Sequence, residues 1–228
     1  MNLNLRTPAG THISNFSFGT MQWGGKADAT DSRAMYDLAR AAGINFFDTA
    51  HGYTGGASET LLGEFVAADR NDLFIATKCA STGDCRPEAI AQDFEDSLGR
   101  LNMDSVDMLY MHRWSDEVPL EATYEVLAKL VQAGRVHHIG VSNYAAWQVM
   151  KAIRVAASFD LKLSLIHFSE PTIPYYISYA VFSLNKIFFS FSFLLFFFFF
   201  FFLSSLPLLF FFSFFFFFFH LFLLHLSL

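Results

Sequence analysis

Residues 44–63 read INFFDTAHGYTGGASETLLG and combine an apolar run, a carboxylate, a glycine-rich loop and the start of an amphipathic segment. The apolar run is typical of a buried β-strand that ends at Asp48. Tyr53 follows in the loop, and a helix is expected from Ser58 onward, with that serine as its cap. This order is that of one β-α unit, and folds with parallel strands place their active sites where the strands end. We therefore expect Asp48 and Tyr53 to lie at a functional edge of a sheet.

The same pattern recurs on both sides of this unit. Asp31 is expected to cap the first helix, and Pro87 suits the first turn of the third. The strands are continuous apolar runs, as in parallel sheets covered by helices. A doubly wound sheet and a (β/α)8 barrel both fit, but no Gly-x-Gly-x-x-Gly turn follows the first strand, which weakens the doubly wound interpretation. Strands are expected at 17–21, 44–47, 73–77, 106–111 and 136–141, and helices at 31–42, 58–68, 87–101, 119–133 and 145–157.

Two further strand ends carry polar side chains, Lys78 and His112. Reduction of a carbonyl leaves negative charge on its oxygen, which needs a proton. A tyrosine can supply that proton, a lysine cation favours the phenolate, a carboxylate holds the lysine, and an imidazole can orient the carbonyl. Each residue alone also fits a structural role, such as a helix cap, a solvated cation or a packed ring. Their joint occurrence at the ends of strands two, three and four predicts a single site.

Five stretches of the chain together carry a family resemblance. They are DTAHGYTGGASETLLG at 48–63, Thr77-Lys78, DMLYMHRW at 107–114, LVQAGRV at 130–136 and IGVSNY at 139–144. In these stretches the chain resembles the aldo-keto reductases. The resemblance covers about residues 3–160, and one departure is Thr54, where glycine commonly follows the tyrosine. It implies an α/β fold, an incomplete (β/α)8 TIM barrel of the first five β-α units. It also implies NADPH-dependent reduction of an aldehyde or ketone, a small-molecule carbonyl substrate, to an alcohol.

The resemblance also implies roles for individual residues. Tyr53 is expected to be the general acid, Lys78 to tune it, Asp48 to hold the lysine, and His112 to orient the substrate carbonyl. Trp114 is expected to wall the substrate pocket, with packing at the barrel rim as the alternative. The other implied residues are Trp23 as a second pocket wall and, as cofactor contacts, Gly19, Thr20, Met21, Asp48, Ser142 and Asn143.

Composition excludes several other functions. The formal net charge is −6 and no basic cluster occurs, so nucleic-acid binding is not expected. Cys79 and Cys85 match no zinc or redox spacing, which favours reduced thiols in a cytoplasmic protein. His137 and His138 would point to opposite faces of a strand, so we expect no metal site there. The N-terminus lacks the apolar stretch of a signal peptide.

The pattern stops near Lys162, which suggests a division into 1–162 and 163–228. The second part holds 23 of the 31 phenylalanines, including unbroken blocks, and residues 187–228 contain no charged side chain. One interpretation is a membrane anchor, since the segment is long enough to span a bilayer. The favoured one is a non-native tail, because residues 163–175 resemble a translated sequencing adapter and poly-thymidine encodes phenylalanine. A barrel needs about 250 residues, so strands six to eight are expected to be missing and the 228-residue chain to be inactive.

Three classes of function therefore stay open. The leading one is a fragment of an NADPH-dependent carbonyl reductase. The second is a regulatory or binding protein on the same scaffold, as the potassium-channel β-subunits are similar to this family. The third is a protein anchored to a membrane through its hydrophobic tail.

Overall fold

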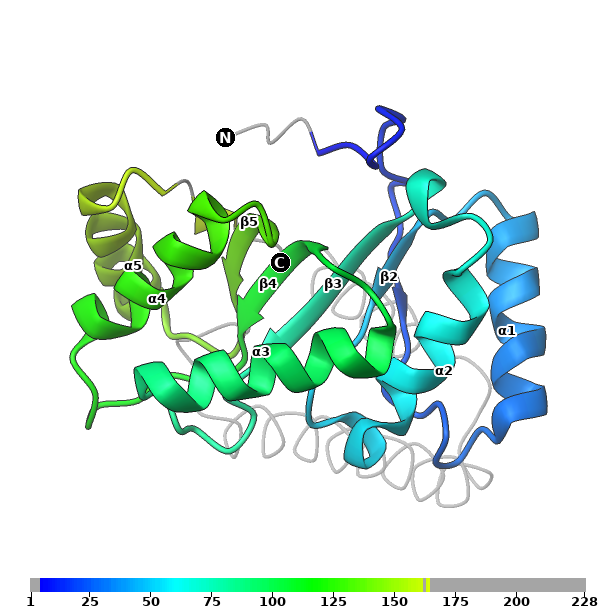
Figure 1. The fold of residues 1–228 in the computed structure, drawn as a ribbon, viewed down its shortest axis with the longest axis horizontal. Helices are drawn as coiled ribbons and strands as arrows, with labels where there is room; N and C mark the ends of the chain where they lie inside the picture. Colours follow the sequence, from blue (N-terminus) through cyan, green and yellow to red (C-terminus); the bar gives the residue numbers. More distant parts are fainter. Residues whose placement is uncertain (1–4, 162, 165–228) are drawn as a thin grey trace, which may run out of the picture. The chain divides into compact units, whose positions relative to one another are not determined.

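The computed structural model of the protein describes residues 5–161 and 163–164. Within them, parallel strands alternate with helices along the chain, and Figure 1 shows the helices following the outer side of the curved sheet. The strands are β1 (Phe18–Gly19), β2 (Phe46–Asp48), β3 (Phe74–Cys79), β4 (Val106–Met111), β5 (Val136–Val141) and β6 (Leu163–Ser164). The helices are α1 (Ala29–Ala41), α2 (Ala57–Val66), α3 (Pro87–Leu101), α4 (Leu120–Gln132) and α5 (Ala146–Ser158), with short 3-10 turns η1 (Tyr53–Gly56) and η2 (Arg70–Asp72).

The strand order separates the two expected architectures. Within the described residues the strands pair in the order β1-β2-β3-β4-β5-β6, each parallel to the one before it. A doubly wound sheet reverses its order at a switch point, whereas a barrel adds strands in sequence. The first five β-α units of a TIM barrel, as the sequence predicts, are therefore confirmed.

Two apolar layers cover the two faces of the sheet. Side chains alternate between the faces along each strand, so Ile75 faces the helices while Phe74 and Ala76 face inward. The helix-side layer is the larger and includes Phe47, Leu62, Phe94 and many others. The inner layer is Leu5, Phe46, Phe74, Ala76, Met108 and Tyr110, with Ile13 packed against it. By the same alternation, Asp48 and Lys78 lie on the inner face near the C-terminal ends of β2 and β3.

The caps of two helices differ from the sequence predictions, while α4 and α5 each begin one residue later than predicted. The first helix is capped by Asp28, whose Oδ1 accepts the N–H of Asp31 at 2.9 Å; Asp31, the expected cap, lies in the first turn. The second helix begins after Gly56, so Ser58 does not cap it. Thr54 Oγ1 instead accepts the Ser58 N–H at 3.1 Å. The prediction of the Ser58 cap was wrong, since its hydroxyl bonds Thr20 and Thr49 in the interior instead.

The sheet also continues further than predicted. The prediction that the sixth strand is missing was wrong, because the short strand β6 pairs with β5. Leu163 of β6 lies beside Ile139 of β5. Leu163 is buried in the helix-side layer, and its apolar side chain explains why the strand forms there. The phenylalanine-rich segment at 187–228 lies outside the described residues.

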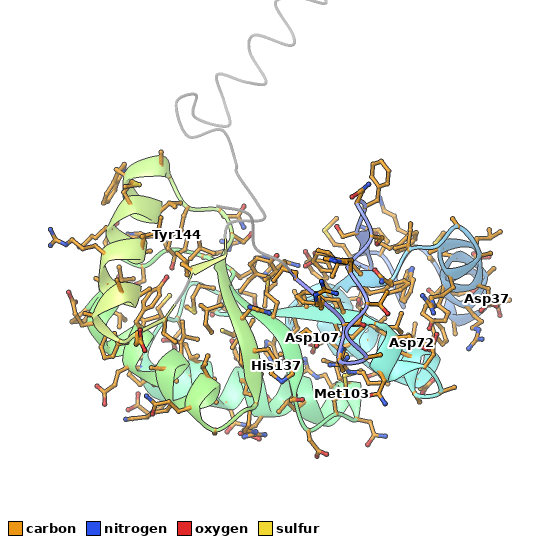
Figure 2. The ribbon with its side chains drawn as sticks, turned by 90° about the horizontal axis from the view of Figure 1, so that it is seen from above. Asp37, Asp72, Met103, Asp107, His137 and Tyr144 are labelled. Atoms are coloured by element: carbon orange, nitrogen blue, oxygen red, sulfur yellow. The ribbon has the colours of Figure 1, made fainter. Side chains whose placement is uncertain are left out.

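The two adjacent histidines of β5 have separate structural surroundings. His137 lies beside Asp107 of the neighbouring strand, with Nδ1 at 3.5 Å from Oδ1 (Figure 2). His138 stacks on the ring of Phe74 at 6.0 Å between centroids. Asp107 is buried and also accepts from Ile75 N and from Arg70. The pair divides between two faces of the strand, as the alternation of side chains predicts.

Candidate active site

Lys78 is the centre of the polar group at the C-terminal ends of the strands. Its ammonium donates to Asp48 Oδ2 at 2.6 Å, to the Thr49 carbonyl at 2.7 Å and to Tyr53 Oη at 3.2 Å. The side chain is 8% exposed and that of Asp48 is 25% exposed. A nearly buried ammonium needs a carboxylate partner and filled donor positions, and these three acceptors meet both needs.

Tyr53 reaches the ammonium because the loop after β2 folds back on itself. Thr54, Gly55 and Gly56 all have positive φ, at 49°, 64° and 96°. A β-branched residue rarely adopts this conformation, but here the Thr54 hydroxyl donates to the Trp23 carbonyl at 2.7 Å. The threonine that departs from the expected glycine is thus held by its own side chain. The Tyr53 ring lies 4.7 Å from Lys78 Nζ and edge-on to His112 at 5.8 Å.

His112 completes the group at the end of β4. Burial, followed by the charges of Lys78 and Arg113, lowers the pKa of His112 from 6.5 to about 4. The ring is therefore a neutral imidazole at neutral pH. Its Nδ1 is buried and has no hydrogen-bond partner among the described residues. Such an imidazole can orient a ligand oxygen without carrying a charge.

The residues expected to contact a cofactor lie around this group. Ser142 N donates to the Met111 carbonyl at 2.8 Å, continuing the strand pairing, and Asn143 follows with a positive φ of 56°. Asn143 Nδ2 donates to the His112 carbonyl at 2.9 Å. On the other side, Gly19 and Met21 are exposed, while Thr20 is fully buried and its Oγ1 bonds Ser58 Oγ at 2.7 Å. Its backbone is bonded as well, because Thr20 N donates to the Asp48 carbonyl while the Thr20 carbonyl accepts from Trp23 N and Ser58 Oγ. Thr20 therefore presents no exposed group to a ligand in this structure.

The two tryptophans expected at the substrate pocket have different surroundings. Trp23 is 1% exposed and packs on Phe18, Phe47 and Phe65, which places it in the helix-side core. Trp114 is half-buried at the rim, edge-on to Tyr144 at 5.2 Å and to Trp147 at 5.5 Å. Asp48, Tyr53, Lys78 and His112, hereafter the tetrad, thus lie with Trp114 at one end of the sheet. Trp23 lies in the core instead.

Sequence reasoning missed two charged residues that brace this site. Glu59 is fully buried and bonds Thr77 Oγ1 at 2.6 Å and Arg100 Nη1 at 3.2 Å. The only sequence signal for Glu59 is its place in the segment that carries Asp48 and Tyr53. Arg100 has no such signal, since an arginine in the last turn of a helix usually reads as solvated.

The part of the chain that the structure describes contains neither a metal site nor a membrane-spanning helix. In residues 5–161 and 163–164, no group of three His, Cys, Asp or Glu side chains is placed to hold a metal ion. Over the same residues, no helix combines the length and the apolar character that crossing a bilayer requires.

The sequence of this chain is similar to a known protein family and to individual known proteins. The sequence model of the aldo/keto reductase family matches residues 15–172, which extends past the boundary at 162 that the sequence suggests. Norsolorinic acid reductase stcV of Emericella nidulans is 38% identical over 168 residues, 63% of this chain and 43% of that protein. A probable voltage-gated potassium channel subunit beta of Oryza sativa subsp. japonica is 29% identical over 189 residues, 78% of this chain and 55% of that protein.

Solved structures agree with the sequence comparison. The crystal structure of the thermostable aldo-keto reductase Tm1743 with the inhibitor epalrestat superposes with a TM-score of 0.61 and 30% identity. The match covers 68% of this chain and 59% of that chain. The chain thus spans about half the length of the curated relatives it matches.

Proposed function

The chain belongs to the aldo/keto reductase family, and from that premise we propose that its tetrad serves the NADPH-dependent reduction of an aldehyde or ketone to an alcohol in the cytoplasm. The observation that supports this proposal is the contact of Lys78 Nζ with both Asp48 Oδ2 and Tyr53 Oη. An ammonium held by a carboxylate and touching a phenol stabilises negative charge on the phenolic oxygen, which is what a proton donor acquires.

Each residue has one task in the proposed mechanism. When bound, NADPH supplies the hydride that adds to the carbonyl carbon. Tyr53 gives its phenolic proton to the carbonyl oxygen, Lys78 stabilises the resulting phenolate, and Asp48 keeps the ammonium charged and in place. His112, neutral and with an unpartnered Nδ1, orients the carbonyl oxygen toward Tyr53. The proton returns to Tyr53 from solvent.

The surroundings of the tetrad fit a nicotinamide cofactor. A carboxamide needs neutral donors and acceptors, and Ser142 and Asn143 offer them at the end of β5 beside the tetrad. Gly19 and Met21 are exposed on the other side, and a Cβ added to Gly19 would meet no atom within 4 Å, so a flat ring can approach there. Asp48 lies next to this side through the contact of its carbonyl with Thr20 N at 3.0 Å.

The test uses the full-length product of the gene that encodes residues 5–161. It is assayed with an aromatic aldehyde and either NADPH or NADH, by loss of the cofactor's near-ultraviolet absorbance. Tyr53→Phe is expected to lower kcat about 100-fold or more. Tyr36→Phe, which removes another buried phenol that bonds Asp69, is the control and keeps kcat. Equal rates for wild type and Tyr53→Phe would exclude the proposed acid.

A binding role on the same scaffold is the second candidate, favoured by the likeness to a probable channel β-subunit. The tetrad does not separate the two, since a protein that binds the cofactor without turnover can keep all four residues. Tight cofactor binding without reduction of any of several aldehydes would favour this candidate.

The proposal extends to the C-terminal part of the chain, of which the structure describes residues 163–164 as β6. We take 163–228 to be a non-native tail, so the 228-residue chain is expected not to turn over. Re-reading the gene beyond the codon for Lys162 from independent DNA tests this: the same phenylalanine codons would restore the anchor as the explanation. Reduction of an aldehyde by the 228-residue chain, lost in Tyr53→Phe, would contradict its inactivity.

A further inference from the structure

Arg100 of α3 bonds both helix α2 and the loop that carries Tyr53. It lies in the last turn of α3, and its Nη1 donates to the His51 carbonyl at 3.0 Å and to Glu59 Oε2 at 3.2 Å. Glu59 belongs to α2, and its other oxygen accepts the Thr77 hydroxyl of β3 at 2.6 Å. One guanidinium and one buried carboxylate therefore join a helix, a second helix, a strand and the loop that carries Tyr53.

The loop also presses against Arg100 at its other end. A Cβ added to Gly56 would lie 2.6 Å from both Cζ and Nε of Arg100, so the guanidinium lies directly on the backbone there. Tyr53 stands between His51, which Arg100 bonds, and Gly56, which Arg100 covers. The guanidinium thus holds both ends of the short segment that presents the phenol.

The same connections reach the lysine. Thr77 precedes Lys78 on β3, so its side chain faces the helices while that of Lys78 faces the site. His51 N donates to the Lys78 carbonyl at 3.0 Å, which ties the loop to the strand from the other direction. Groups outside the site therefore contact both the loop of Tyr53 and the strand of Lys78, whose polar atoms lie 3.2 Å apart.

We propose that Arg100 and Glu59 are positioning residues that hold Tyr53 against Lys78 from the helix side of the sheet. The proposal rests on the proposed function, in which this contact carries the proton transfer. Neither residue touches the reacting atoms. Loosening them displaces the phenol relative to the ammonium, so the chemical step slows while the binding of substrate and cofactor changes little.

The kinetic test compares three arginine variants of the full-length gene product. Arg100→Ala is expected to lower kcat about 10-fold to 100-fold, with KM and the Kd for NADPH within about 2-fold, because small displacements of a catalytic group cost that much. Arg100→Lys restores part of kcat. Arg135→Ala, which breaks the ion pair between Glu95 of the same helix α3 and the turn before β5, is the matched control and keeps kcat within about 2-fold.

Thr77→Val keeps the test decisive if Arg100→Ala does not fold. It removes one hydroxyl from the Glu59 carboxylate and is expected to lower kcat about 3-fold to 10-fold, the worth of one hydrogen bond. A fall in kcat that is equal in Arg135→Ala, or a change in KM alone, would overturn the positioning role.

A second readout needs no turnover. With meta-fluorotyrosine incorporated, the fluorine resonance of Tyr53 is assigned by its loss in Tyr53→Phe. It is expected to shift or broaden in Arg100→Ala and to stay in place in Arg135→Ala. An unmoved resonance in Arg100→Ala overturns the inference, whereas a wild type that reduces no aldehyde but shows the shift contradicts only the proposed function.

Discussion

The neutral state of His112 makes the full-length protein sensitive to acid in a defined range. Burial and the charges of Lys78 and Arg113 lower the pKa of His112 from 6.5 to about 4. Above about pH 6.5 the ring is neutral in both the folded and the unfolded chain. Between about pH 6.5 and about pH 4, the His112 imidazole binds a proton in the unfolded chain but not in the folded chain. Lowering the pH through this range therefore favours unfolding.

The size of the effect follows from the same shift. A fall from 6.5 to about 4 corresponds to about 3 kcal/mol between the two protonation states if it counts fully. Because the ring is only half-buried, solvent screening reduces the expected loss of unfolding free energy to about 1–2 kcal/mol. His112→Gln keeps a polar side chain of similar length and removes the titration.

Urea unfolding at about pH 7.5 and about pH 4.5 measures this loss. Wild type is expected to lose about 1–2 kcal/mol more than His112→Gln between the two conditions, and the difference between the proteins cancels the other histidines. The NMR titration of the His112 ring is expected to have a midpoint near 4. A midpoint at or above 6.5, or equal losses in both proteins, would refute the neutral imidazole and its place in the mechanism.

Three further predictions concern other parts of the chain. Lys78→Met is expected to lower kcat of the full-length protein about 100-fold or more, measured beside its melting temperature to separate catalysis from folding. Gly63→Ala puts a Cβ at 2.4 Å from the Leu101 carbonyl oxygen and is expected to cost about 2 kcal/mol in urea unfolding, whereas Gly99→Ala meets no atom within 4 Å and costs nothing. Burial raises the pKa of Cys85 to about 11, so a disulfide reagent at about pH 8 is expected to label it only after unfolding.

The elements that the sequence predicted to the residue are those with strong boundary signals. The helix at 87–101 begins at Pro87 and is followed by Asn102, whose φ is 53°. The strands at 106–111 and 136–141 are mainly apolar, interrupted by Asp107 in one and by His137 and His138 in the other, and turn residues bound them on both sides. Such signals act through the backbone conformation of single residues and need no knowledge of the rest of the fold.

The predictions that failed depended on tertiary partners. Asp28 and Asp31 are equally good caps by type, and only the path of the chain before α1 selects the first. The Ser58 hydroxyl could either cap the helix or bond other buried hydroxyls. The sequence does not show that Thr20 and Thr49 lie close enough to bond it. Trp23 stands just after a strand, where a pocket wall is plausible, but the turn at 20–23 carries the ring under Phe18 and into the core.

The tetrad could be predicted because each member stands at a strand end or in the loop that follows one. The side chains that hold the tetrad from the helix side could not be predicted. Adjacent residues of a strand face opposite sides, so Asp48 and Lys78 on the inner face are each next to a threonine on the helix side. Thr49 bonds Ser58 at 2.9 Å, and Thr77 bonds Glu59 at 2.6 Å.

Ser58 and Glu59 are consecutive in α2, only a few residues after Tyr53. The segment that supplies the carboxylate and the phenol therefore also supplies the two side chains that fix the strands beneath them. Because a catalytic site must hold its groups to within about 0.5 Å, this local bracing explains how the first half of a barrel can assemble all four residues.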